Sequence, residues 1–148
     1  MIGLLQRVSA AQVVVDGEVI GAIDHGLLVL VCAERGDNET SARKLLDKLL
    51  AIRVFGDAAG KMNRSVRDVA GGLLLVPQFT LAADVRSGTR PSFSAAADPV
   101  LGRHLFQLVV DEAARAPAHG ASGRFGADMK VALTNDGTSS RSSASASR

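Results

Sequence analysis

The feature that most restricts the fold is a pair of apolar runs, "LLVLVCA" at 27–33 and "LLLV" at 73–76. Neither run alternates between apolar and polar residues, and both have the length of a strand, which is typical of strands buried on both faces. We therefore predict two central strands, the second continuing through "PQFTL" to Leu81. Cys32, the single cysteine, lies inside the first run, where a small buried core residue explains it better than a catalytic thiol.

Turn signals divide the rest of the chain into further strands. Residues 2–15 have the pattern of one long strand, whose imperfect alternation indicates a bulge or contacts on both faces. Asp16-Gly17 predicts a hairpin turn into a strand at 18–23, and "DHG" turns the chain again at 24–26. A last strand is predicted at 125–134, where alternate residues are apolar: Phe125, Ala127, Met129, Val131 and Leu133.

Two segments carry the signals of amphipathic helices. Asp37 or Asn38 can cap a helix that runs to about Ile52 and has an apolar stripe. Asp98 is the expected N-cap of a second helix, with Pro99 in its first position. The predicted order is therefore three strands, a helix, short strands, a strand, a helix and a strand.

The composition fits one globular domain and argues against several classes of protein. With 148 residues, 47% hydrophobic and 22% charged, the chain is long enough to bury a core. Only 3% of residues are aromatic, which argues against a base-stacking platform for single-stranded nucleic acid. No stretch approaches the roughly 18 apolar residues of a membrane span, and Gln6 and Arg7 interrupt any signal peptide. We expect a cytoplasmic protein without a membrane partner.

The net charge of +2 does not by itself indicate a polyanion partner, but the charge is unevenly distributed. Between residues 60 and 96, five basic side chains accompany only Asp68 and Asp84. The basic residues are Lys61, Arg64, Arg67, Arg86 and Arg90. This segment either faces phosphates or forms a solvated loop surface, and the sequence leaves both interpretations open.

The familiar catalytic motifs are missing. His25, His104 and His119 lack the spacing of metal ligands, and no glycine-rich phosphate loop, nucleophile elbow or paired-cysteine zinc motif occurs. We therefore expect neither a metal nor a cofactor. If the protein is an enzyme, its catalysis has to come from positioning and from main-chain dipoles.

The most unusual local sequence is "VPQFTLAAD" at 76–84. Pro77 cannot donate a hydrogen bond to a sheet, so one side of this strand is expected to be unpaired or bulged there. On the predicted strand Gln78 and Thr80 share a face, and Phe79 points the other way. Thr80 is either an ordinary β-branched strand residue or, with Gln78, part of a polar site beside free main-chain groups.

Several longer stretches together resemble one family. Over residues 1–137 the sequence is similar, in order and without large gaps, to the D-aminoacyl-tRNA deacylases of the bacterial and eukaryotic type, the D-Tyr-tRNA deacylase family. The stretches that carry the resemblance are "LLQRVSAAQVVVDGEVIGAI", "GLLVLV", "KLLDKLLAIRVFGDAAGKMN", "PQFTLAAD", "RSGTRPSF" and "GRFGADMKVALTNDG".

The resemblance implies a fold and an activity. The fold is a single compact α/β domain with a curled, mostly antiparallel, barrel-like sheet and two main helices. The activity is hydrolysis of the ester that joins a D-amino acid, or glycine, to the 3′ adenosine of tRNA, in translation quality control. No cofactor takes part, and the partner is the 3′ end of aminoacyl-tRNA. The active site lies at the subunit interface of a homodimer.

The resemblance also assigns site residues. The family's Ser-Gln-Phe-Thr motif corresponds to Pro77, Gln78, Phe79 and Thr80, whose main-chain groups surround the substrate carbonyl and the terminal adenosine. Either Thr80 is the nucleophile or the tRNA 2′-hydroxyl assists the attacking water; we favour the second, because no nearby sequence feature supplies a base.

Four further residues complete the expected binding site. Phe125 and Met129 match residues that line the adenosine and amino-acid pocket. Chiral selection in the family depends on a cis Gly-Pro pair reached across the dimer interface. Gly137 corresponds to the glycine of this pair, and Arg7 is expected to help hold the loop that carries it.

The chain departs from the family at two places. Pro77 replaces the motif serine, and Gly137 is followed by Thr138 instead of proline, which predicts a trans bond. After the folded domain at 1–137, residues 138–148 form a serine-rich tail that we expect to be disordered, leaving an open sheet edge. The alternative function is therefore an impaired paralogue that binds tRNA 3′ ends without efficient or chirally selective turnover.

Overall fold

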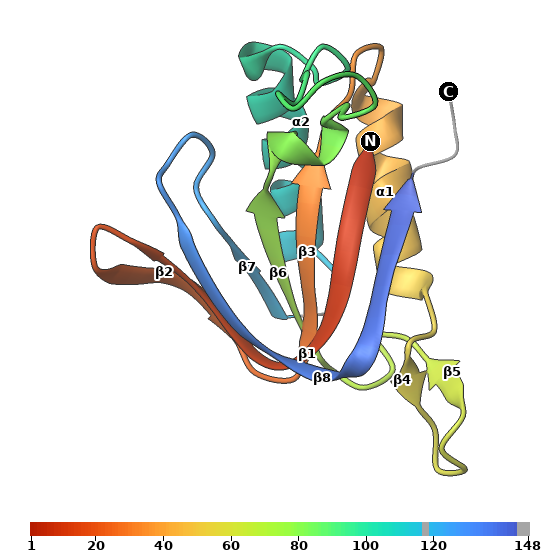
Figure 1. The fold of residues 1–148 in the computed structure, drawn as a ribbon. Coiled ribbons are helices and arrows are strands. Elements are labelled where there is room, and N and C mark those ends of the chain that lie inside the picture. Colours follow the sequence, from red (N-terminus) through yellow and green to blue (C-terminus); the bar gives the residue numbers. More distant parts are fainter. Residues whose placement is uncertain (117–118, 145–148) are drawn as a thin grey trace.

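A computed structural model describes the backbone of residues 1–116 and 119–144, and the side chains as far as Gly137. The described residues form an α/β domain in which a strongly curled sheet is backed on one side by two α-helices (Figure 1). The fold class expected from the resemblance is confirmed, with the qualification that the sheet is mixed. Neither described helix is long and apolar enough to cross a membrane.

The long strand β1 organises the sheet. Its antiparallel partners are β2 and β3 along one edge and β8 along the other, whereas β6 and β7 extend the sheet from β3 as parallel strands. The strands are β1 (Ile2–Val15), β2 (Glu18–Ile23), β3 (Gly26–Cys32), β6 (Gly72–Pro77), β7 (His119–Ser122) and β8 (Lys130–Ala144). A register shift after Val13 confirms the irregularity predicted in the first strand. Asp16 and Gly17, with φ of +50° and +78°, form the predicted hairpin turn.

The two apolar runs are buried on both faces, as predicted. In β3 and β6, Leu27, Val29 and Leu73 belong to a core shared with the helices. The alternate residues Leu28 and Leu74 belong to a second core inside the curl of the sheet, with other side chains from β1 and β2. Burial on both faces explains why neither run contains a polar residue.

The helices begin where their capping residues predict. In α1 (Glu39–Ala51) the Asn38 side chain accepts from the Ser41 amide while the Ser41 hydroxyl accepts from the Asn38 amide, a reciprocal cap. In α2 (Pro99–Ala114) the Asp98 carboxylate accepts from the amides of Val100 and Leu101. Between the helices, β4 (Phe55–Gly56) and β5 (Met62–Arg64) form a small hairpin that projects from the domain (Figure 1).

The predicted strand at 73–81 is shorter in the structure, which corrects one expectation. β6 ends at Pro77, and Phe79–Ala82 form a 3₁₀ turn, η1. The Gln78 amide still donates to the Val31 carbonyl at 2.8 Å, so the nitrogen of Pro77 faces the opposite edge. On that edge β7 has already ended, opposite Leu75. The prediction of an unpaired side at Pro77 is therefore confirmed, although Gln78 and Thr80 do not continue the strand.

The C-terminal strand also differs from expectation. It begins at Lys130 instead of residue 125, because Gly126 has φ +78° and starts a turn. Asp136-Gly137 is not a hairpin but lies at a register shift, after which β8 continues to Ala144 along β1. The sequence predicted a disordered tail from residue 138 and an open sheet edge, but residues 138–144 instead continue β8. They can do so without apolar side chains, because strands pair through main-chain hydrogen bonds. Residues 145–148 lie outside the described part of the chain.

Candidate active site

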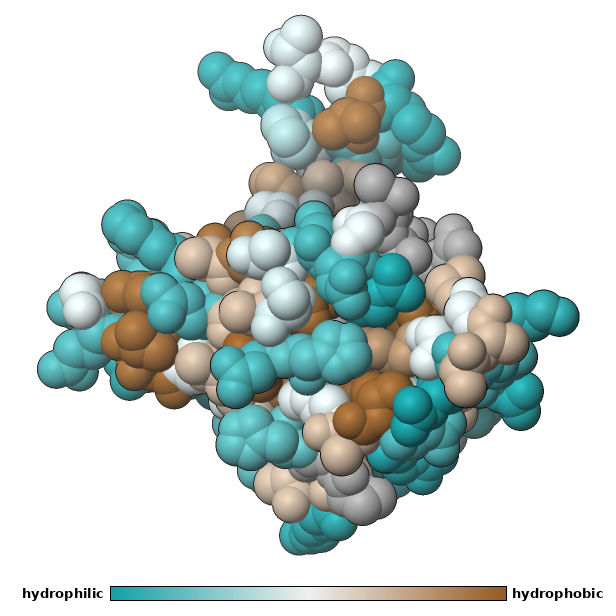
Figure 2. Space-filling model, turned by 90° about the horizontal axis from the view of Figure 1, so that it is seen from below, coloured by the Kyte–Doolittle hydropathy of each residue, from teal (hydrophilic) through white to brown (hydrophobic). Residues whose placement is uncertain are grey.

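A cavity of about 890 Å³ opens where β3 and β6 end. Its walls come from four places: the ends of these strands, the loop before α2, the first turns of α2, and the turn at 125–129. Figure 2 shows the face at the other end of the domain, where hydrophobic surface is broken into small patches among hydrophilic residues. The cavity walls are more apolar: Val31, Cys32, Ala33, Pro77, Phe79, Phe93, Ala96, Ala97, Pro99, Phe106, Phe125, Ala127 and Met129 all contribute.

Five of the eight predicted site residues line this one cavity: Pro77, Gln78, Phe79, Phe125 and Met129. Thr80 is adjacent, and its hydroxyl accepts a hydrogen bond from the Gln78 side-chain amide. The residues near Pro77 are far in the sequence from Phe125 and Met129, but the sheet brings them together, because the Gly123 amide donates to the Leu75 carbonyl at 2.8 Å. That bond holds the 123–129 segment beside the end of β6.

Two aromatic residues form the mouth of the cavity. Phe79 is 59% exposed, and its ring meets that of Phe93 edge to face with the centroids 5.1 Å apart. Phe93 and Phe106 were not predicted as site residues. Phe93 lies within the stretch "RSGTRPSF", which carries the family resemblance, whereas the only sequence signal for Phe106 is its place on the apolar face of α2.

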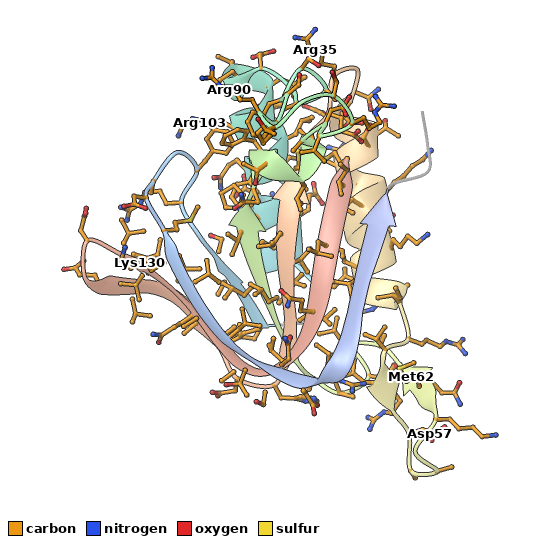
Figure 3. All side chains as sticks on the ribbon, in the orientation of Figure 1. Arg35, Asp57, Met62, Arg90, Arg103 and Lys130 are labelled. Carbon is orange, nitrogen blue, oxygen red and sulfur yellow. The ribbon has the colours of Figure 1, made fainter. Side chains whose placement is uncertain are left out.

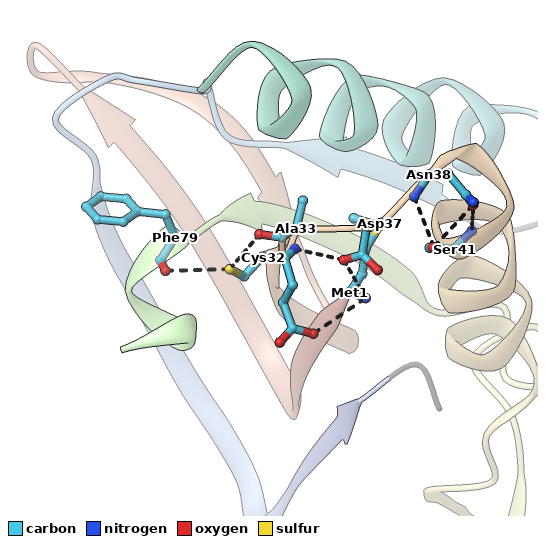
Figure 4. A network of polar contacts seen from close by, with 8 residues as sticks. Met1, Cys32, Ala33, Asp37, Asn38, Ser41 and Phe79 are labelled. Carbon is cyan, nitrogen blue, oxygen red and sulfur yellow. Dashed lines mark hydrogen bonds and ion pairs between the residues drawn. The ribbon is translucent and has the colours of Figure 1, made fainter. Parts of the chain in front are cut away.

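Cys32 lies in the wall of the cavity and is 2% exposed, which confirms the prediction of a buried core residue. Its thiol donates to the carbonyls of Ala33 and Phe79 at 3.4 and 3.5 Å (Figure 4). Burial raises the pKa of this thiol, and the nearby Glu34 carboxylate raises it further. Cys32 is therefore held protonated at neutral pH and links β3 to the η1 turn.

Arg7 and Gly137 lie elsewhere in the protomer. The Arg7 guanidinium donates from Nε to the Asp136 carbonyl at 3.0 Å and from Nη1 to the Val54 carbonyl at 2.7 Å. Arg7 and Asp136 line a separate hollow of about 560 Å³, together with His25 and Phe55. Arg7 thus holds the segment that contains Gly137, but within one protomer neither residue reaches the main cavity.

The cavity contains few ionisable groups. Among the described lining residues these are Cys32, Arg35 and Asp98, and Asp98 is occupied in capping α2. The described residues contain no group of three His, Cys, Asp or Glu side chains placed to hold a metal ion. The arrangement offers main-chain groups, an amide and a hydroxyl beside an apolar hollow, which suits a reaction driven by positioning.

Comparisons with known proteins agree with this geometry. The profile of the D-Tyr-tRNA(Tyr) deacylase family matches residues 4–140. The chain is 67% identical over 137 residues to a D-aminoacyl-tRNA deacylase of Janthinobacterium sp. (strain Marseille), covering 93% of this chain and 92% of the relative. It is 65% identical, with the same coverage, to a protein of that name from Herminiimonas arsenicoxydans.

Two solved structures are similar in fold. One, of the c-Myc DNA Unwinding Element Binding Protein, has a TM-score of 0.91 and 33% identity, and the match covers 97% of this chain and 98% of that one. The other, of a probable eukaryotic D-amino acid tRNA deacylase, has a TM-score of 0.77 and covers 95% and 97%; at 17% identity it shows the fold alone. On the extent of these matches, the chain belongs to the D-Tyr-tRNA(Tyr) deacylase family.

Proposed function

We propose that this chain is a D-aminoacyl-tRNA deacylase, an ester hydrolase that releases the D-amino acid, or glycine, from the 3′ adenosine of tRNA. The observation that carries the proposal is the convergence of Pro77–Phe79 with Phe125 and Met129 on one apolar cavity. Family membership and the names of relatives at 63–67% identity support the same reaction. Those relatives give no support to the alternative of an impaired paralogue.

The main chain of Gln78–Thr80 is the expected partner of the ester group. Attack of water on the ester produces a tetrahedral oxyanion, which fixed main-chain N–H groups stabilise most effectively in a water-poor cavity. Two contacts hold this segment in place: the Gln78 amide donates to Val31, and the Cys32 thiol donates to the Phe79 carbonyl. Because these contacts exist before substrate binds, little reorganisation is needed during the reaction.

We assign activation of the attacking water to the tRNA 2′-hydroxyl, and we do not assign Thr80 as the nucleophile. A nucleophilic hydroxyl needs an acceptor that removes its proton. The hydrogen bond recorded for the Thr80 hydroxyl comes from the Gln78 amide, which is a donor. In this arrangement Thr80 serves to orient the Gln78 side chain at the cavity wall.

We assign chiral selection to a homodimer. Gly137 lies outside the main cavity of its own protomer, beside the hollow that contains Arg7 and Asp136. In a dimer the Gly137 segment of one protomer would reach the partner's cavity, where main-chain carbonyls receive the substrate ammonium and leave no room for an L side chain. Because its substrate would be aminoacyl-tRNA, we also propose that the protein works in the cytoplasm.

The test of the reaction is deacylation of D-Tyr-tRNA, glycyl-tRNA and L-Tyr-tRNA by the purified protein. The proposal predicts cleavage of the first two, and binding without turnover would refute it. Cleavage of all three esters would show that the altered Gly137–Thr138 sequence no longer selects chirality. Thr80→Val tests the mechanism: a nucleophile would lose at least about a hundredfold in kcat, whereas an orienting residue loses less. Thr134→Val, exposed on β8, is the matched control.

The dimeric site is tested by complementation. Gly102 lines the cavity, so Gly102→Trp fills it, and Gly137→Val disturbs a residue with φ +77°. Each variant alone should be inactive. Mixed dimers restore one complete site, which combines the open cavity of one protomer with the unchanged Gly137 of the other. Failure of every mixture to recover activity, with dimers demonstrated by ultracentrifugation, would exclude a shared site.

A further inference from the structure

A second hollow of about 680 Å³ lies next to the main cavity, and the two share the side chains of Phe106 and Phe125. Its polar lining includes Arg103, Gln107, Ser122 and Arg124. These four residues define what we call the arginine groove. It lies between the exposed face of α2 and the end of β7.

Arg103 stands at the boundary between the cavity and the arginine groove. Its guanidinium lies over the ring of Phe125, 5.1 Å from the ring centroid. Its Nη2 atom is 3.7 Å from where a Cβ on Gly126 would lie, and Gly126 also lines the cavity. Figure 3 shows Arg103 at the same end of the domain as Arg35 and Arg90, far from Met62 and Asp57. A chain that leaves the cavity past Phe125 therefore meets this guanidinium first.

The arginine groove has an excess of positive charge. Arg103 and Arg124 are exposed, and neither forms an ion pair with a carboxylate among the residues that the structure describes. The nearby acidic side chains have other partners, since Glu39 accepts from His104 at 2.9 Å and Asp111 accepts from Gln107 at 2.8 Å. Two guanidiniums without carboxylate partners, in a hollow that also contains the Ser122 hydroxyl, suit a phosphodiester chain.

We propose that the arginine groove binds the phosphates of the two cytidine nucleotides that precede the terminal adenosine of tRNA. This inference rests on the proposed function, because it assumes that the adenosine and the aminoacyl group occupy the main cavity. The shared Phe106 and Phe125 make the groove the direct continuation of that cavity. Arg103 and Arg124 would each contact one phosphate, and Arg103 can stay stacked on Phe125 while it does so.

The test compares three esters of the same D-amino acid: the D-aminoacyl adenosine, the D-aminoacyl trinucleotide CpCpA and the complete D-aminoacyl-tRNA. For single strands the logarithm of the affinity falls with the logarithm of the salt concentration, with a slope of about −0.7 per phosphate contact. One contact therefore raises the affinity about fivefold in roughly 0.1 M salt relative to about 1 M salt. Arg103→Ala and Arg124→Ala should each raise KM for the trinucleotide and for tRNA by about fivefold. Arg124→Ala should leave KM for the adenosine ester and kcat for all three esters unchanged. Arg103→Lys, which keeps the charge, should recover most of the affinity.

Lys61→Ala is the matched control, since it removes one positive charge from the β4–β5 hairpin, on the far side of the domain. Equal losses in this variant and in Arg103→Ala would overturn the inference, and so would unchanged trinucleotide kinetics in the double arginine variant. If the unmodified protein cleaves aminoacyl-tRNA and the arginine variants have the same KM, the inference about the arginine groove is wrong and the proposed function stands. If the unmodified protein cleaves none of the esters, the proposed function itself fails.

Discussion

The tie between Arg7 and the Asp136-Gly137 segment makes a quantitative prediction. Arg7 is 17% exposed, and its guanidinium connects the buried Val54 carbonyl to the Asp136 carbonyl on β8. Arg7→Met keeps the aliphatic packing of the stem but removes the hydrogen bonds to both carbonyls, a weaker one to the Met62 sulfur and the exposed ion pair with the Asp136 carboxylate. It therefore leaves one buried carbonyl without its donor and frees the strand at the register shift.

The hydrogen bonds to the two carbonyls contribute differently to the free energy of unfolding. The part-buried bond to the Val54 carbonyl is worth about 1.5–3 kcal/mol, because its donor is charged. The bond to Asp136, whose side chain is half exposed, is worth about 0.5–1 kcal/mol after competition with water. Arg7→Met should thus lower the free energy of unfolding by roughly 2–4 kcal/mol, which corresponds to a Tm lower by about 5–15 °C.

Urea unfolding at one fixed protein concentration measures the total effect, and amide hydrogen exchange at residues 135–137 measures the local one. Gln6→Ala is the neighbouring control: it removes one exposed bond of 3.4 Å to Asn135 and should change stability by less than about 0.5 kcal/mol. If Arg7→Met is as stable as this control, or if exchange at 135–137 is unaltered, the guanidinium does not hold the segment.

Three further predictions concern the cavity, the hairpin and the thiol. Phe79→Ala should raise KM for the tRNA ester by about 5- to 150-fold in steady-state assays, with little change in Tm, because the ring is 59% exposed and can stack on a base beside its edge-to-face contact with Phe93. Hydrogen bonds from the Asn63 side chain and the Lys61 amide lower the pKa of Asp57 below 3.8, so they stabilise the hairpin at neutral pH and are lost as the pH falls through that lowered pKa. Asp57→Asn should abolish this acid dependence of amide exchange in the hairpin. Cys32 should react with a thiol reagent far more slowly in the native protein than in urea, because burial raises its pKa and hides it; equal rates would contradict the structure.

Local signals in the sequence were sufficient for most elements of the fold. The run at 27–33 is a doubly buried strand, Asp16-Gly17 is a hairpin turn, and Asn38 and Asp98 cap the helices, since each depends on contacts within a few residues. The strand end at Pro77 was missed because Phe79 and Leu81 continue an apolar pattern. The end of β7 opposite Leu75, which leaves that edge of β6 unpaired at Pro77, depends on residues far away in the sequence.

The site was only partly predictable for the same reason. Phe125 and Met129 alternate with exposed neighbours as a strand would, yet Gly126, with its positive φ, places them on a turn at the cavity. Phe106 could not be distinguished from any other apolar helix residue. The family resemblance supplied the residues near Pro77, whereas the arginine groove depends on how α2 and β7 pack, which no local pattern records.

The pairing of the first strand with the last has a consequence for synthesis on the ribosome. β1 and β8 are paired from Ile2↔Ala144 to Val14↔Lys130, with two register shifts, so one long edge of β1 has no partner until residues 130–144 have been translated. The nascent protein must carry this unsatisfied edge beside an assembled apolar interior, and such edges recruit strands from other chains. Slow translation before residue 130 should therefore favour aggregation, and chaperones that shield nascent polypeptides should matter more for yield than the stability of the finished protein.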